Sequence, residues 1–253
     1  MRYEIWNLGS SSEGNCFIVK HKDCKEALML ECGLSYEQFK RRWVGAGNAP
    51  YPTTVLISHE HLDHCRGWEK FCNQGFNVYA SVGTADALGD TEGNIKRLNL
   101  QKWQMVGVFR SCYAVFPLKS NHDAGEPLMY LIRCTHPLAD DTLLFAIDTA
   151  GIPYILDEFK ITDMLVECNY IEECISPDID PIRMERTRKT HMSLDTLVKF
   201  FERGQINLKN LEQITLCHLS QSNCDPWKAK ETIMAATGVP VRICAAKGGF
   251  IGN

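Results

Sequence analysis

Short runs of apolar and β-branched residues, separated by polar or glycine-containing turns, recur along almost the whole chain. Buried strands of α/β proteins have this continuous apolar pattern, because both faces of their sheets are covered. We therefore predict strands over residues 3–8, 16–19, 27–30, 55–57, 78–80, 103–109, 112–118, 128–133, 143–147, 164–167, 214–217 and 239–244.

Helical spacing of apolar residues predicts helices between several of these strands. Ser193, for example, is a suitable N-cap for a helix with one apolar face. Residues 89–101 are polar and contain glycine, which favours a mobile surface segment, and the pattern weakens between residues 168 and 190. The predicted helices cover residues 36–45, 67–73, 84–88, 193–204 and 225–236.

The strand at 55–57 runs directly into a loop with the pattern H-x-H-x-D-H, formed by His59, His61, Asp63 and His64. His59 and His61 are two residues apart and point the same way from an extended chain. Unpaired imidazoles and carboxylates are costly to bury, so a divalent cation is their natural partner. A polar loop that is rich in histidine by chance is the alternative, but three of the chain's eight histidines lie here.

Other apolar strands also end in residues that can bind a metal: His122, Asp148 and His218. The ends of neighbouring strands meet at one edge of a sheet, so we expect these residues to gather there. His191 precedes the helix that starts after Ser193 and is either structural or functional. Cys65 lies outside the pattern, and we expect it to pack in the helix that follows the histidine-rich loop.

The composition is that of an ordinary globular protein, with 253 residues, 45% of them hydrophobic and 23% charged. We expect one domain over residues 1–253. A net charge of −4 excludes a global basic field, so binding of DNA or RNA would need local basic patches or metal ions.

The cysteines indicate the compartment. All twelve are scattered without a C-x-x-C pair, and the N-terminus lacks the basic start and apolar core of a signal peptide. We therefore expect reduced, mostly buried thiols in a cytoplasmic protein. No apolar run approaches the roughly 20 residues that span a bilayer, so we expect no membrane association.

Two polar segments could contact an anionic substrate. The loop after the first strand offers backbone N–H groups and hydroxyls, although it could equally be a tight turn. A basic cluster before His191, which includes Arg183, either favours an anion or is a solvated loop. The candidate substrate-binding residues are Ser10, Ser11, Ser12, Asn15, Arg186, Arg188 and Lys189.

With these residues the chain resembles the metallo-β-lactamase superfamily. HEHLDH at 59–64, His122, Asp148 in AIDTAG and His218 in LCHLS carry the likeness, and their order spans nearly the whole chain. Within the superfamily the chain most resembles the YycJ/WalJ-type hydrolases, a group described as exonucleases or phosphodiesterases. The segments that carry this closer likeness are GSSSEGNC (9–16), SNHDAGEPLMYLI (120–132), LVECNY (165–170), THMS (190–193) and CHLSQSN (217–223).

The resemblance implies an α/β fold, an αββα four-layer sandwich in which two mixed β-sheets face each other with helices outside. It also implies two divalent metal ions, which could be Zn, Mn or Fe. By resemblance, Asp148 and a water or hydroxide bridge the two ions. The expected ligands of the first ion are His59, His61 and His122, and those of the second are Asp63, His64 and His218.

By the same resemblance the protein is a metal-dependent hydrolase, and the leading hypothesis is a phosphodiesterase or nuclease in which a metal-bridging hydroxide attacks a phosphodiester of DNA or RNA. Asp63 is expected to act both as a ligand and as a partner of the nucleophilic water, and His191 to contact the scissile phosphate or the leaving oxygen. The alternative is a small-molecule hydrolase of the same fold, with a cyclic phosphodiester, thioester or lactone substrate.

Three departures from the family pattern limit what the resemblance implies. Glu31 stands where the superfamily often has Asp, and THMSL replaces the more usual GHLSN. Segment 174–189 lacks the family's usual sequence, which leaves the substrate contacts there open. There is also no room for the extra β-CASP domain of the larger RNA-processing relatives.

Overall fold

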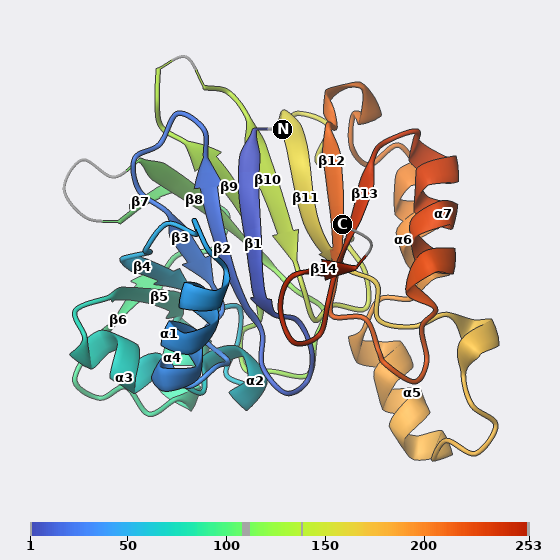
Figure 1. The fold of residues 1–253 in the computed structure, drawn as a ribbon, viewed down its shortest axis with the longest axis horizontal. Coiled ribbons are helices and arrows are strands. Elements are labelled where there is room, and N and C mark those ends of the chain that lie inside the picture. The colour runs from blue at the N-terminus through green and yellow to red at the C-terminus, as the bar shows by residue number, and fades with distance from the viewer. Residues whose placement is uncertain (1, 108–111, 138, 252–253) are drawn as a thin grey trace.

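The computed structural model describes residues 2–107, 112–137 and 139–251, and two mixed β-sheets dominate it (Figure 1). The first sheet has the order β1-β2-β3-β4-β5-β6. Strands β1 to β3 pair antiparallel, and β3 to β6 pair parallel. Its strands are β1 (Tyr3–Gly9), β2 (Cys16–His21), β3 (Leu28–Leu30), β4 (Thr54–Leu56), β5 (Asn77–Ser81) and β6 (Ile95–Leu98).

The second sheet has the order β14-β13-β12-β11-β10-β9-β8-β7. Its central strands β10 to β13 run parallel, and both flanks are antiparallel. Its strands are β7 (Gln104–Val106), β8 (Tyr113–Lys119), β9 (Leu128–Cys134), β10 (Thr142–Ala146), β11 (Ile161–Glu167), β12 (Gln213–Cys217), β13 (Val241–Cys244) and β14 (Phe250–Ile251).

Successive residues of each strand pack on opposite sides of their sheet, as the two-residue repeat of a strand requires. In β9, Leu128, Tyr130 and Ile132 lie in a core shared with the first sheet. Met129 and Leu131 lie in a second core shared with helices. In the first sheet, Phe17 and Val19 of β2 lie in the shared core and Ile18 lies in a third core with helices. Both sheets are therefore covered on two faces, which explains their continuous apolar runs.

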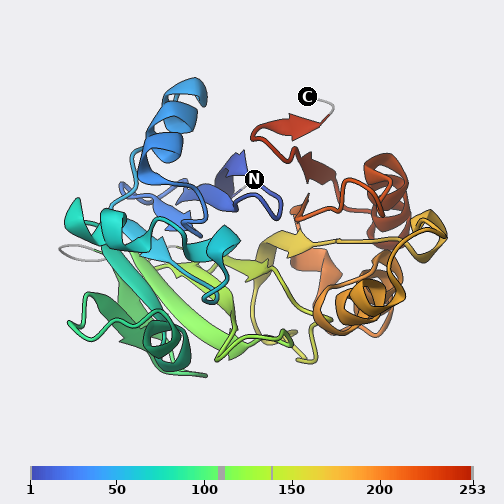
Figure 2. The same cartoon turned by 90° about the horizontal axis from the view of Figure 1, so that it is seen from below.

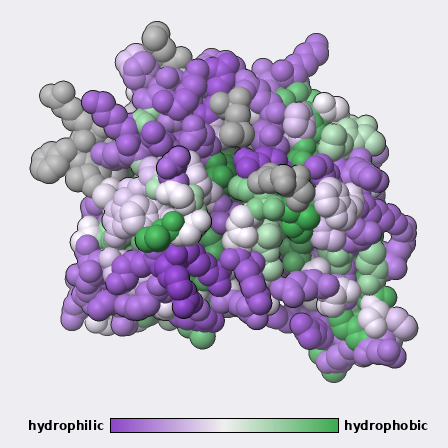
Figure 3. Space-filling model, in the orientation of Figure 1, coloured by the Kyte–Doolittle hydropathy of each residue, from purple (hydrophilic) through white to green (hydrophobic). Residues whose placement is uncertain are grey.

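Helices form the two outer layers. On the first sheet lie α1 (Tyr36–Gly45), α2 (Leu62–Cys65), α3 (Trp68–Asn73) and α4 (Val82–Ala87). On the second lie α6 (Leu194–Glu202) and α7 (Pro226–Thr237), while α5 (Pro181–Thr190) extends below them (Figures 1 and 2). The short 3₁₀ helices η1 (Glu172–Cys174) and η2 (Leu208–Asn210) complete the set. The outer surface over α3 is hydrophilic (Figure 3), as expected for a helix whose apolar side faces a sheet.

The expected fold is confirmed, and the main differences are in the segments between strands. Residues 89–101, where we predicted a mobile surface segment and no strand, contain β6, which pairs parallel with β5. The weakly patterned 168–190 region contains α5, where Asp180 caps the helix and Pro181 is its first residue. Of the strand predicted over 103–109, β7 covers three residues, and 108–109 lie outside the described residues. No helix of the described ranges is long and apolar enough to cross a membrane.

Candidate metal centre

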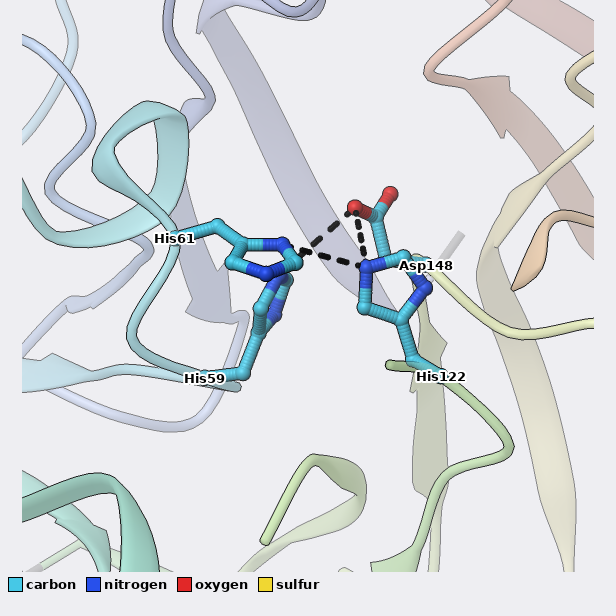
Figure 4. Close-up of side chains that lie close together, drawn as sticks. All are labelled: His59, His61, His122 and Asp148. Atoms are coloured by element: carbon cyan, nitrogen blue, oxygen red, sulfur yellow. Dashed lines mark hydrogen bonds and ion pairs between the residues drawn. The ribbon is translucent and has the colours of Figure 1, made fainter. Parts of the chain in front are cut away.

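The loop after β4 carries the H-x-H-x-D-H motif at one edge of the sandwich. His61 is the N-cap residue of α2, and Asp63 and His64 lie within this short helix. His59 and His64 are fully buried. Figure 4 shows His59 and His61 on one side, facing His122 and Asp148 on the other.

The loop after β1 and the end of β3 hold this turn in place. The Asn15 backbone N–H donates to the Asp63 carbonyl at 2.7 Å. Gly33 approaches so closely that a Cβ at this position would lie 1.7 Å from the same carbonyl oxygen. Only glycine fits there, so the turn's position is set by backbone contacts as well as by side chains.

The remaining expected ligands also follow strands: His122 comes after β8, Asp148 after β10 and His218 after β12. Asp148 and His218 have left-handed backbones, with φ of 46° and 51°, as does Glu31 after β3 at 65°. Non-glycine residues adopt this region rarely, and such strain clusters at functional sites.

The first group of possible ligands comprises His59, His61, His122 and Asp148, whose ligand atoms all lie within 4.8 Å of one another. His122 Nε2 lies 3.2 Å from His61 Nδ1 and 3.4 Å from Asp148 Oδ2. His59 Nε2 lies 3.7 Å from the same oxygen. These are the residues that the resemblance assigns to one ion, with Asp148 as the bridge.

The second group comprises Asp63, His64, His218 and again Asp148, within the same 4.8 Å limit. His64 Nε2 lies 3.2 Å from Asp148 Oδ2 and 3.3 Å from Asp63 Oδ2. His218 Nε2 lies 3.7 Å from Asp63 Oδ2. The structure thus brings together all seven expected ligands, in the two expected sets that share Asp148.

In His59 and His122, a contact on the far side of the ring leaves the other nitrogen facing the centre. His59 Nδ1 contacts the Ser58 hydroxyl at 2.9 Å, and His122 Nδ1 contacts the Thr190 carbonyl at 2.8 Å. The carbonyl can only accept, so His122 Nδ1 carries the proton and its Nε2 keeps a free lone pair. Contacts of this kind orient metal-binding histidines.

The chemistry of the centre fits divalent cations. Among the described residues, the buried atoms His59 Nε2 and His218 Nε2 have no hydrogen-bond partner. Buried polar atoms normally have one, so these nitrogens are suited to a ligand that donates no proton. Imidazole and carboxylate ligands without thiolate suit zinc, manganese or iron.

Without a cation, the site carries protons. Burial lowers the pKa values of His59 and His122 below the ordinary histidine range. Burial also opposes protonation of His64 and His218, but the charge of Asp148 and hydrogen bonds to carboxylates outweigh it. They raise the pKa of His64 well above its usual value and that of His218 to about 10. A cation must displace these protons, so its affinity falls as the pH falls.

His191 lies beside the metal centre at the end of α5. Its Nδ1 contacts Glu167 Oε1 at 2.6 Å and lies 3.7 Å from Asp148 Oδ1, and its side chain is 15% exposed. Burial lowers the pKa of His191, but the charge and hydrogen bond of Glu167 outweigh it and raise the pKa above its ordinary value. Glu167 therefore favours the protonated form of His191, whose side chain remains partly accessible from solvent.

Glu167 is the residue that sequence reasoning missed. It ends β11, is fully buried, and also contacts His218 Nδ1 at 3.1 Å. Its other oxygen accepts the backbone N–H groups of Thr149 at 3.1 Å and Met192 at 3.3 Å. The available signal was a lone carboxylate at the end of an apolar strand, the same pattern that pointed to Asp148.

The candidate serine-rich loop lies against the metal centre. Ser10 accepts the His218 backbone N–H at 2.8 Å, and Asn15 Nδ2 lies 3.2 Å from His64 Nε2. Ser11 is buried and accepts a neighbouring backbone N–H, whereas Ser12 is exposed. Ser10 and Asn15 thus support ligand residues, and contact of this loop with substrate stays a prediction.

The basic residues expected to attract an anion lie on α5, where three of them already have acidic partners. Arg186 binds Asp123 through two nitrogens, at 2.7 and 3.1 Å. Two further pairs are Arg188 with Glu172 and Lys189 with Glu185, both at 2.9 Å. These pairs neutralise much of the cluster's charge.

Several solved structures share the fold of this chain. The metallo-beta-lactamase fold protein YhfI from Bacillus subtilis has a TM-score of 0.68 and 16% identity, over 98% of each chain. Yeast PDE1 has a TM-score of 0.70 and 16% identity, over 98% of this chain and 99% of its own. The short form of human tRNase Z has a TM-score of 0.55 and 13% identity, over 86% of this chain and 93% of its own.

At these identities the structural likeness establishes the fold alone. No protein of curated function matches the sequence. The sequence profile described as the beta-lactamase superfamily domain matches residues 28–211, well over half of the chain. The chain therefore belongs to the beta-lactamase superfamily, in its metallo-hydrolase fold.

Proposed function

We propose that this protein is a metal-dependent phosphodiesterase, and more specifically a cytoplasmic nuclease of the YycJ/WalJ type. The observation that carries the proposal is the pair formed by Glu167 and His191, 2.6 Å apart, next to Asp148. An alkoxide that leaves a phosphodiester needs a proton, whereas a thiolate, with a pKa of about 8.5 for its thiol, leaves more readily without one. A protonated His191 held by Glu167 therefore favours a phosphodiester substrate over a thioester substrate.

Each residue of the centre has a role in this proposal. His59, His61 and His122 would hold one ion, Asp63, His64 and His218 would hold the other, and Asp148 lies within reach of both groups. Two divalent ions would lower the pKa of the attacking water and neutralise charge on the phosphoryl oxygens. Asp63 accepts the proton of that water, and His191 donates one to the leaving oxygen.

The identity of the substrate is the finer part of the proposal. The fold is shared with human tRNase Z, whose name describes an enzyme that acts on RNA. Binding a long nucleic acid usually relies on many cationic contacts with phosphates. Arg186, Arg188 and Lys189 are already paired with carboxylates, which favours a short or cyclic phosphodiester as the second candidate.

One set of assays separates these candidates. After its metal content is measured, the purified protein is loaded with manganese or zinc and given linear DNA, single-stranded RNA, a cyclic dinucleotide and a thioester. We expect cleavage of at least one phosphodiester, and a loss of 10²- to 10⁴-fold in His191→Ala at unchanged metal content. Thioester turnover without any phosphodiester cleavage would contradict the proposal.

A further inference from the structure

A second group of residues with metal-binding side chains lies away from the site described above. It comprises His21, Cys24 and Cys134, whose ligand atoms lie within 4.8 Å of one another. His21 ends β2, and Asn15, which contacts the metal centre, directly precedes that strand. A six-residue strand is about 20 Å long, so the two sites lie at opposite ends of the sandwich. In Figure 1 this end is at the top, and α2 marks the other.

The local chain conformation brings these side chains together. The Cys24 backbone N–H donates to the His21 carbonyl at 3.0 Å, which closes a tight turn with H-x-x-C spacing. Cys134 ends β9 in the second sheet and places its Sγ 3.0 Å from Cys24 Sγ. Two ligands with two residues between them on a turn match the ligand spacing of structural zinc sites, and Cys134 adds a third ligand from a distant strand.

All three residues of this group are buried, whereas the catalytic site includes the partly exposed residues His61, Asp63 and His122. His21 is 0% exposed, Cys134 1% and Cys24 4%. Burial, followed by the hydrogen bond with Cys134, raises the pKa of the Cys24 thiol well above its ordinary value. A neutral, buried thiol reacts slowly with oxidants, which argues against a redox function for this pair.

A carboxylate behind the histidine completes the arrangement. Asp141 Oδ2 contacts His21 Nε2 at 3.2 Å. The other oxygen, Oδ1, has no hydrogen-bond partner among the described residues and lies 3.8 Å from Arg2 Nε. A carboxylate on one ring nitrogen typically orients a histidine that binds metal through the other. His21 Nδ1 now accepts the N–H of Asp23, an exposed residue whose amide water can satisfy instead.

We propose that His21, Cys24 and Cys134 bind one zinc-type divalent ion as a structural site, independent of the catalytic ions. Two thiolates and an imidazole form a ligand set for zinc and similar borderline ions, and not for magnesium or calcium. The ion ties the loop after β2 in the first sheet to the end of β9 in the second. It binds the folded chain only, so it stabilises the sandwich.

Cobalt is the probe that distinguishes this site from the catalytic one. The metal-free protein is titrated with Co²⁺, and the near-ultraviolet charge-transfer band from thiolate to cobalt is recorded. The catalytic ligands include no thiolate, so cobalt bound there gives no such band. We expect the band in the wild type and in Cys72→Ser, a half-buried thiol outside the cluster, and at least a tenfold loss of it in Cys24→Ser and Cys134→Ser.

A second measurement needs no variant. X-ray absorption at the zinc edge of the wild type, loaded at both sites, should show sulfur neighbours at about 2.3 Å. A spectrum with nitrogen and oxygen neighbours only would overturn the proposal. So would a cobalt band that persists in both cysteine variants, a band lost instead in Cys65→Ser beside the catalytic site, or an intact mass that shows a disulfide between Cys24 and Cys134.

Discussion

Replacement of Glu167 by glutamine tests how His191 is used. The change keeps the shape of the side chain and removes the negative charge that contacts His191 Nδ1 at 2.6 Å. Without that charge the pKa of His191 falls, because burial then dominates. Less of the imidazole is protonated at neutral pH, so the rate falls and its decline on the alkaline side begins at lower pH.

The size of the effect follows from the contact. A hydrogen bond to a charged group contributes about 1.5–3 kcal/mol. Because 1.36 kcal/mol corresponds to a factor of ten, we expect Glu167→Gln to lower kcat by roughly 10- to 100-fold. Glu185→Gln, at an exposed carboxylate of α5, is the matched control and should leave the rate unchanged.

The assay compares two leaving groups. A nitrophenyl phosphodiester releases a stable phenolate that needs no proton, whereas a dinucleotide releases an alkoxide that does. We expect Glu167→Gln to slow hydrolysis of the dinucleotide much more than hydrolysis of the nitrophenyl ester. Metal content is measured alongside, because Glu167 also contacts His218 Nδ1 at 3.1 Å.

Two results would refute this reasoning. Equal losses on both substrates would mean that proton donation is not what Glu167 supports. The double variant Glu167→Gln with His191→Ala gives the other criterion, since residues that act as a unit are not additive. If its loss were the product of the two single losses, Glu167 and His191 would act independently.

Three further predictions concern stability and metal binding. Burial raises the pKa of Asp163 from its ordinary value of 3.8 to about 6, which costs up to about 3 kcal/mol once the carboxyl is ionised. Since the folded state binds this proton more tightly, the free energy of unfolding declines as the pH rises from about 4 to 6. Urea unfolding of Asp163→Asn should show no such decline, and at pH 8 this variant should be more stable than the wild type. Gly33→Ala forces a Cβ against the Asp63 carbonyl and should destabilise the fold by about 3 kcal/mol or more in thermal unfolding, whereas Gly45→Ala, with open space, should not. Chelation of bound metal should abolish hydrolysis and lower the melting temperature, both restored by added manganese or zinc, and an unchanged melting temperature would contradict this.

The sequence was sufficient to predict which candidate ligands the structure brings together, because each follows an apolar strand. His122 and Asp148 stand directly past β8 and β10, and His218 past β12. Strand ends of an α/β fold converge on one edge, so a polar residue at each end is enough to suggest a site. The order of the motifs along the chain then indicated the superfamily, and with it the two sheets.

The interactions around the ligands could not be predicted in the same way. Whether Arg186 meets a substrate or Asp123 depends on how α5 packs, and no local pattern records that contact across 63 residues. Helix α5 itself was missed because it buries only Met184 and Thr190 and so lacks an apolar face, although Asp180 and Pro181 mark its start.

Strand order alone does not explain why Asp148 and His218 lie close together, and their backbone conformations supply the rest of the explanation. Strands β10 and β12 are separated by β11, so they lie roughly 10 Å apart at their ends. His218 Nδ1 nevertheless lies 3.0 Å from Asp148 Oδ1, and both residues have left-handed backbones. We infer that these two turns direct the side chains across the end of β11, over Glu167. The sequence pattern shows which residues reach the edge of the sheets, and two strained residues determine that they meet.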